Sequence, residues 1–155
     1  MFRSLIFTCI TILLSSCTVK NDRLDRVNFE ELLEELFSKY SYKTEVSFYK
    51  EELDVSNAYI PKNKMSKSDF EVNIEKELLV KGWIKIHPLF DDQNIYCYDE
   101  KNELSIIYPT KDHYVNNSGD SMDVSEENLD KWIILYRYNM YGNTNCENYS
   151  KNNLR

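Results

Sequence analysis

The hydrophobic pattern changes period between residues 28 and 50, and this change limits the folds open to the chain. Over residues 29–40 the apolar side chains recur at helical spacing and form one stripe, made of Phe29, Leu32, Leu33, Leu36, Phe37 and Tyr40. Over residues 42–50 the period becomes two, because Val46 and Phe48 alternate with polar neighbours. The pattern predicts an amphipathic helix followed by a half-buried strand, so the fold must combine both kinds of element.

Two helices have predictable ends. Asn28 is a favoured N-cap, and Glu31 stands three residues later as in a capping box. Ser68 begins a second capping-box signature, which is followed by apolar residues every four positions at Phe70, Ile74 and Leu78. Gly82 stands where this second helix should end, because glycine readily adopts the left-handed conformation at C′.

Further strands are predicted from runs of β-prone residues at 83–87, 94–98, 104–108 and 132–141. The run at 132–141 is almost continuously hydrophobic, which favours a central strand. Residues 51–67 and 110–125 lack a sustained period and are predicted to be loops, with an extended piece at 58–60 and a helical turn before residue 131.

These elements together predict an α+β fold. Two amphipathic helices are expected to pack on one face of a mostly antiparallel sheet of four to five strands. The single domain is expected to cover residues 27–149, and residues 150–155 are expected to fray.

The first sixteen residues have the layout of a secretory signal peptide. Arg3 supplies a positive start, Leu5 to Leu14 form a short apolar run, and small residues follow. This run is too short to span about 30 Å of hydrocarbon as a permanent helix.

Leu14-Ser15-Ser16-Cys17 resembles the lipobox of bacterial lipoproteins. The resemblance implies cleavage before Cys17, acylation of this cysteine with palmitate-type chains, and attachment to the cell envelope without a transmembrane segment. Residues 17–26 would then be a lipidated tether. Thr18 occupies the position where an aspartate would favour inner-membrane retention, so the resemblance implies the periplasmic face of the outer membrane. A plain secreted protein is the alternative.

The charge balance argues against one class of partner. Removal of the leader leaves 18 basic residues against 26 acidic ones. Nucleic-acid binding needs clustered Lys and Arg to displace counterions, so no nucleic-acid partner is expected.

Two cysteines, Cys97 and Cys146, remain in the mature domain apart from Cys17. Two thiols in an oxidising compartment are expected to form a disulfide, and two separate reduced thiols are the alternative. Cys97 as a nucleophile is a further, weaker hypothesis. Neither a metal site nor a cofactor is predicted, because the cysteines lie far apart in sequence and the chain has only two histidines.

The histidines give two further candidates for catalysis. His87 is followed by Asp91 and Asp92, and His113 follows Asp112, so each histidine has a carboxylate nearby in sequence. No glycine-rich phosphate loop and no nucleophile elbow is present. An envelope hydrolase that uses His87 or His113 is therefore the alternative hypothesis, and no catalytic residue is assigned.

Tyrosines on the predicted strands favour a binding function. Six of them lie in such runs or at their ends: Tyr96, Tyr98, Tyr108, Tyr136, Tyr138 and Tyr141. Tyrosine is common at interfaces because its ring is apolar and its hydroxyl stays hydrated. The sequence therefore predicts a non-catalytic, lipid-anchored envelope protein that binds another protein, of the immunity, inhibitor or assembly-accessory type. A structural spacer without a partner is a third hypothesis.

Overall fold

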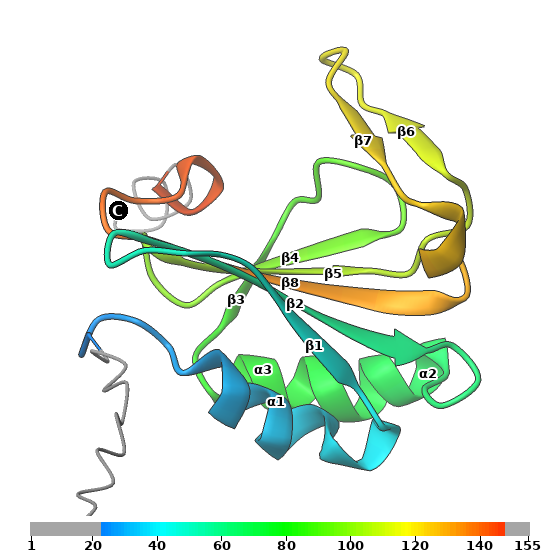
Figure 1. Ribbon diagram of the computed structural model, residues 1–155, viewed down its shortest axis with the longest axis horizontal. Coiled ribbons are helices and arrows are strands. Elements are labelled where there is room, and N and C mark those ends of the chain that lie inside the picture. The colour runs from blue at the N-terminus through cyan, green and yellow to red at the C-terminus, as the bar shows by residue number, and fades with distance from the viewer. Residues whose placement is uncertain (1–22, 148–155) are drawn as a thin grey trace, which may run out of the picture.

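The computed structural model, which describes residues 23–147, contains two antiparallel sheets (Figure 1). The larger sheet has the strand order β1-β2-β8-β5-β4-β3. Its strands are β1 (Lys43–Tyr49), β2 (Leu53–Pro61), β3 (Ile84–Ile86), β4 (Gln93–Cys97), β5 (Asn102–Ile107) and β8 (Lys131–Asn139). The smaller sheet is a hairpin of β6 (His113–Val115) and β7 (Ser121–Asp123). The leader, Cys17 and residues 148–155 lie outside the described residues.

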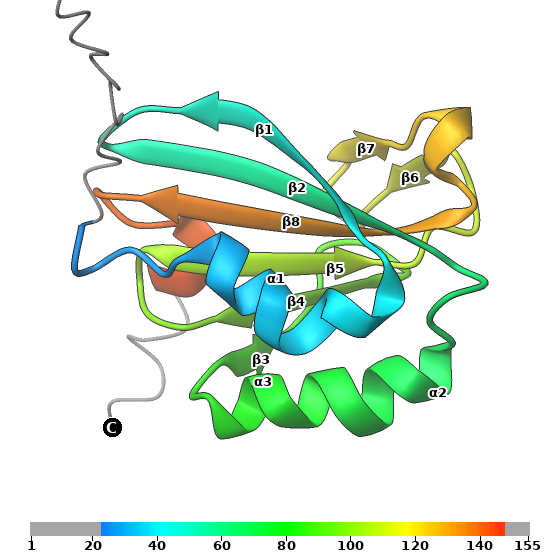
Figure 2. The ribbon, with the colours of Figure 1, turned by 60° about the horizontal axis from the view of Figure 1, so that its bottom comes forward.

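Two helical segments cover one face of the larger sheet (Figures 1 and 2). The first consists of α1 (Phe29–Phe37) and the 3-10 helix η1 (Ser38–Tyr40). The second is continuous and consists of α2 (Lys67–Asp69), the π-helix η2 (Phe70–Glu75) and α3 (Lys76–Val80). A short 3-10 helix, η3 (Glu126–Asn128), precedes β8. The predicted α+β class with a mostly antiparallel sheet is therefore confirmed.

The predicted number of strands was too low. The larger sheet has six strands instead of four to five, and the chain adds the β6–β7 hairpin. β2 fills most of the predicted loop at 51–67, because two of its four buried side chains, Asp54 and Ser56, are polar and hide the alternation. The hairpin was missed because its strands have only three residues each, which is too few to show a period.

The ends of the helices follow local hydrogen bonds. Asn28 caps α1, since its side chain accepts a hydrogen bond from the Glu31 backbone N–H, as predicted. The second segment begins two residues earlier than predicted, because Ser66 and Asp69 form the capping box instead of Ser68. Gly82 has φ +90°, the left-handed conformation expected after the last turn.

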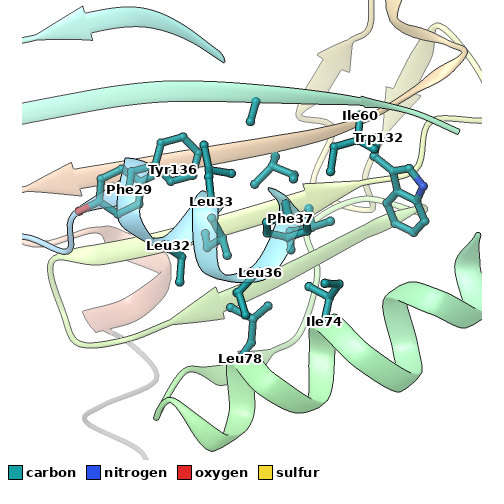
Figure 3. Close-up of a cluster of buried hydrophobic side chains, with 14 of the residues drawn as sticks. Phe29, Leu32, Leu33, Leu36, Phe37, Ile60, Ile74, Leu78, Trp132 and Tyr136 are labelled. Carbon is teal, nitrogen blue, oxygen red and sulfur yellow. The ribbon is translucent and has the colours of Figure 1, made fainter. Parts of the chain in front are cut away.

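The core lies between the helices and the larger sheet, and Figure 3 shows its main side chains. α1 contributes Leu33 and Phe37, and the second segment contributes Ile74 and Leu78. The sheet meets them with alternate residues of its central strands, including Ala58, Ile60, Ile106, Trp132 and Ile134. We call this region the apolar end of the layer beneath the helices.

The same layer is polar where the chain enters the domain, at the opposite end of the strands (Figure 1). The side chains here come from the entering segment and from β2, β5 and β8: Asp25, Arg26, Asp54, Asn102, Tyr136 and Tyr138. Asn102 is fully buried, and its side-chain oxygen accepts hydrogen bonds from the Val27 backbone N–H at 3.0 Å and from the Tyr136 hydroxyl at 2.6 Å. We call this cluster the polar end.

Candidate functional site

β1 forms one edge of the larger sheet. It pairs with β2 on one side, and no further strand within residues 23–147 lies on its other side. All seven of its residues are exposed, so the prediction of a half-buried strand was wrong. The helices cover the central strands and leave this edge open (Figure 2). Such an edge presents backbone N–H and C=O groups that can pair with another chain.

The exposed side chains of β1 include large apolar groups. Val46 is 59% exposed, and Phe48 and Tyr49 are each 41% exposed. A bulge interrupts the pairing with β2 between Val46 and Phe48. Bulges and charged residues such as Lys43 and Glu45 discourage indiscriminate pairing of edge strands, so this edge favours a partner of complementary shape and charge.

A small cavity lies beside β1 on the helix side of the sheet. It has a volume of about 100 Å³ and lies between the start of α1 and the strands β1 and β2. Its lining includes Thr44 and Val46 of β1, Asp54 and Ser56 of β2, and Arg26 of the segment before α1. The cavity is large enough for a side-chain tip but too small for a drug-sized ligand.

Buried polar groups form one wall of this cavity. Asp54 accepts a hydrogen bond from the Ser56 hydroxyl at 2.8 Å, and the Arg26 guanidinium lies 4.0 Å from its other carboxylate oxygen. Arg26 also donates to the Tyr49 hydroxyl at 3.1 Å and lies 5.0 Å from the centre of the Tyr49 ring. These contacts link the end of β1 to the polar end of the layer beneath the helices.

Asp25 holds the entering segment against the sheet. Its carboxylate lies 2.7 Å from the Lys101 ammonium and 3.1 Å from Nε of Arg23, and it accepts a hydrogen bond from the Tyr138 hydroxyl. The hydrogen bonds from Lys101 and Arg23 hold the pKa of the Asp25 carboxyl well below its usual range. Burial and the Asp25 charge raise the pKa of Tyr138.

The two cysteines of the domain lie at disulfide distance. The sulfur atoms of Cys97 and Cys146 are 2.10 Å apart, and their Cα atoms are 5.6 Å apart. Cys97 ends β4, and Cys146 lies in the turn that follows β8, so the pair crosses β5. Both sulfurs are buried, which removes Cys97 from the candidates for a nucleophile.

The structure does not assemble a catalytic site around either histidine. His87 is exposed and makes no contact with a carboxylate within the described residues, because Asp92 binds the Thr110 and Tyr114 hydroxyls instead. His113 pairs with Asp123 across the β6–β7 hairpin, with 2.6 Å between Nδ1 and Oδ1, and not with Asp112. This pair is solvent-exposed at the far end of the molecule.

The tyrosines have divided roles. Tyr96, Tyr136 and Tyr138 point into the core beneath the helices and are fully buried, so they cannot contact a partner. Tyr98 and Tyr141 are exposed, while Tyr108 is half-buried. The aromatic groups available on β1 are Phe48 and Tyr49. The tyrosines that the sequence indicated for an interface all lie on later strands or at their ends.

Two kinds of feature are absent from residues 23–147. In this part of the chain, no group of three or more His, Cys, Asp or Glu side chains converges as a metal site would require. None of its helices has the length and apolarity needed to cross a membrane. Comparison of the chain with family models, with curated proteins and with solved structures gives no match.

Proposed function

We propose that the folded domain is a non-catalytic protein-binding module of the bacterial cell envelope, and that β1 is its binding element. The observation that carries this proposal is the open edge, where a seven-residue strand exposes its entire length. An extended segment of a partner can add to such an edge through main-chain hydrogen bonds, while side-chain pockets supply specificity. An immunity protein, an inhibitor or an assembly accessory could all bind in this way.

The geometry beside β1 supports side-chain recognition. A strand added to β1 would place alternate side chains on the helix side of the sheet, next to Val46 and the mouth of the small cavity. On the opposite side of the sheet its side chains would lie next to Phe48. Both faces of the partner strand would therefore be recognised. On the helix side a short side chain or side-chain tip of the partner would fill the cavity, and on the opposite side an apolar residue of the partner would cover Phe48.

The proposal also includes the location of the protein in the cell. The lipobox at Leu14–Cys17 supports attachment through lipid on Cys17, at the periplasmic face of the outer membrane in a Gram-negative cell. The Cys97–Cys146 pair at disulfide distance supports an oxidising compartment such as the periplasm.

Photo-crosslinking in the native host tests the binding element. A photoreactive phenylalanine analogue at position 48 should give a discrete adduct with a second protein, whereas the same analogue at Val115 should not. Val115 is a matched control because it is 60% exposed on the distant β6 strand. The same adduct from both positions, or none from position 48, would contradict the proposal. An adduct of twice the chain's mass would show pairing with a second copy and would also contradict it.

Intact-mass measurement of the membrane fraction tests the anchor separately. The proposal expects a mature chain that begins at Cys17 and carries added acyl mass, and this species should disappear in Cys17→Ala. An unlipidated chain cut at another position would contradict the anchor and leave the binding element untouched.

The alternative of an envelope hydrolase would use His87 or His113, and of these only His113 lies within hydrogen-bond distance of a carboxylate, that of Asp123. A binding module should give an unchanged adduct from position 48 in His113→Ala and in His87→Ala. Loss of a hydrolytic activity in either variant, with the adduct retained, would favour the enzyme.

A further inference from the structure

A second cavity lies at the apolar end of the layer, away from β1. It has a volume of about 320 Å³ and is bounded by the second helical segment, the start of β4 and the aromatic rings of Tyr108 and Trp132. This volume is at the lower end of the range for small-molecule sites. The cavity is therefore of a size for a small metabolite, whereas the cavity beside β1 is not.

The helical wall of this cavity is a π-helix. Residues 70–75 form η2, and both Glu71 and Glu75 of this segment line the cavity together with Lys67 of the preceding turn. π-helical turns are rare, and they occur frequently at functional sites. The local geometry thus presents one basic and two acidic side chains of the same segment to the cavity.

Several charged groups of the lining already have partners. Glu75 lies 2.6 Å from the Lys85 ammonium and accepts a hydrogen bond from the Tyr96 hydroxyl at 3.1 Å. Asp92 accepts a hydrogen bond from the Tyr114 hydroxyl at 3.0 Å and another from the Thr110 hydroxyl. These groups are committed to the fold.

Three polar side chains of the lining lack such partners within residues 23–147. Lys67 makes no ion pair with a carboxylate, and its ammonium lies 4.4 Å from the centre of the Tyr108 ring. Glu71 makes no ion pair, and the Asn94 amide makes no hydrogen bond. The lining therefore includes a cation, an anion and an amide that make no ion pair or hydrogen bond with residues 23–147, although Lys67 also lies near the Asp92 carboxylate.

Asn94 is unusual for its position in the sheet. It pairs with Ile106, on the face that carries Tyr96, Leu104 and Ile134 into the core. The Asn94 amide is half-buried and stays accessible to water, since Tyr40 carries the only completely buried side-chain polar atom without a hydrogen-bond partner in the described part of the chain. An amide both accepts and donates hydrogen bonds, so Asn94 can bind either kind of polar group in the cavity.

We propose that this cavity binds a small zwitterion of the α-amino-acid type. Its carboxylate is bound by the Lys67 ammonium and its ammonium group by the Glu71 carboxylate, while the Asn94 amide bonds to either group. Tyr108 and Trp132 supply an apolar wall for the side chain. The near balance of charge in the lining, two lysines against three acids, favours a ligand without net charge over a simple anion or cation.

Binding to the folded domain is measured by calorimetry and ligand-observed NMR, with each standard L-amino acid as a separate probe up to about 10 mM. Acetate and methylammonium serve as probes that carry only one of the two charges. We expect at least one amino acid to bind, and Lys67→Met, Glu71→Gln and Asn94→Leu each to weaken it by about tenfold or more. Lys76→Met and Glu77→Gln are matched controls on α3, outside the cavity, and should leave the affinity unchanged.

Three outcomes would overturn this inference. The first is no binding of any amino acid. The second is binding that the Lys67 and Glu71 variants leave intact. The third is equal binding of acetate or methylammonium. Lys67 and Glu71 are exposed, so their substitution should not impair folding, and Asn94→Leu is interpreted only where its thermal midpoint is retained.

Discussion

The two ends of the layer beneath the helices stabilise the domain by different means. At the apolar end, Leu33, Phe37 and Leu78 are fully buried against Ile60 and Trp132, and their stabilisation is non-directional. At the polar end, directed hydrogen bonds to Asn102 and ion pairs to Asp25 hold the segment before α1 against the larger sheet.

The difference indicates a division of labour. Apolar packing supplies most of the free energy of folding, because each buried aliphatic side chain contributes about 1.5–3 kcal/mol. A satisfied polar network contributes less net energy but admits only one arrangement of its partners. The polar end therefore fixes the position of the segment before α1, and through Arg26 and Tyr49 it also fixes the end of the exposed strand β1.

The largest effect on stability is expected from the apolar end. Leu33→Ala should lower the free energy of unfolding by about 3–5 kcal/mol, because it leaves a cavity at a fully buried position. Urea denaturation followed by circular dichroism measures the change. Leu79→Ala is the matched control, since Leu79 is half-exposed on α3 and should change stability by less than about 0.5 kcal/mol. Similar losses in both variants would contradict the packing described for the apolar end.

A comparable but smaller loss is expected when the Cys97–Cys146 pair is removed. The cysteines are 49 residues apart, so the chain-entropy model gives at most about 4 kcal/mol for closing this loop. The double variant with Ser at both positions should show this loss under oxidising conditions. The parent chain treated with dithiothreitol should behave like the variant. If the reductant leaves the parent's midpoint unchanged and two thiols are titrated before treatment, the cysteines are not paired.

At the polar end, Asn102→Ala should cost about 2–3 kcal/mol, because it leaves the Val27 backbone N–H and the Tyr136 hydroxyl without their acceptor. The variant should also accelerate hydrogen exchange at Val27, which Leu33→Ala would do only through global unfolding. Asn73→Ala is the control, since Asn73 is exposed on the second helical segment. A loss in Asn102→Ala no larger than in Asn73→Ala would mean that the network contributes nothing to stability.

The smallest expected effect is a change in pH dependence. The pKa of Asp25 is lowered in the folded state, so its contribution to stability is present above the ordinary pKa of 3.8 and is lost as the pH falls below it. Asp25→Asn should therefore lower the thermal midpoint at pH 7 and reduce the difference between the midpoints at pH 7 and pH 3. Asp91→Asn, at an exposed loop position, should preserve the parent's profile. Parallel profiles for Asp25→Asn and the parent would contradict the role of the Lys101 and Arg23 contacts.

The sequence predicted the elements whose signals are local. The stripe of α1, the run of β8 and the Gly82 turn were predictable because each depends on neighbouring residues. β2 was not predictable, since Asp54 and Ser56 occupy buried positions where the expected pattern has apolar residues. They are accommodated there by Arg26 from a distant part of the chain, a contact that no local pattern encodes.

The candidate binding edge was only partly predictable. The alternation over residues 42–50 predicted the strand, but whether a strand lies at the edge or the centre depends on the order of the whole sheet. The pairing of Cys97 with Cys146 was expected from their number and compartment, and the structure brings their sulfurs to bonding distance. His113 was selected for the wrong carboxylate, because the partner across a hairpin cannot be read from adjacent residues.

The fixed entry of the chain at the polar end also determines how an anchored domain could move. Five residues, 18–22, lie between Cys17 and residue 23, and a chain of this length reaches about 20 Å at most. β8 runs nine residues from the hairpin end of the domain to the polar end, a distance of about 30 Å. A domain held by lipid on Cys17 would therefore have a short tether at its polar end. It could rotate about this end, but β1 would stay within a few tens of ångströms of the bilayer. A partner of such a domain would have to present the strand that pairs with β1 within this distance of the bilayer.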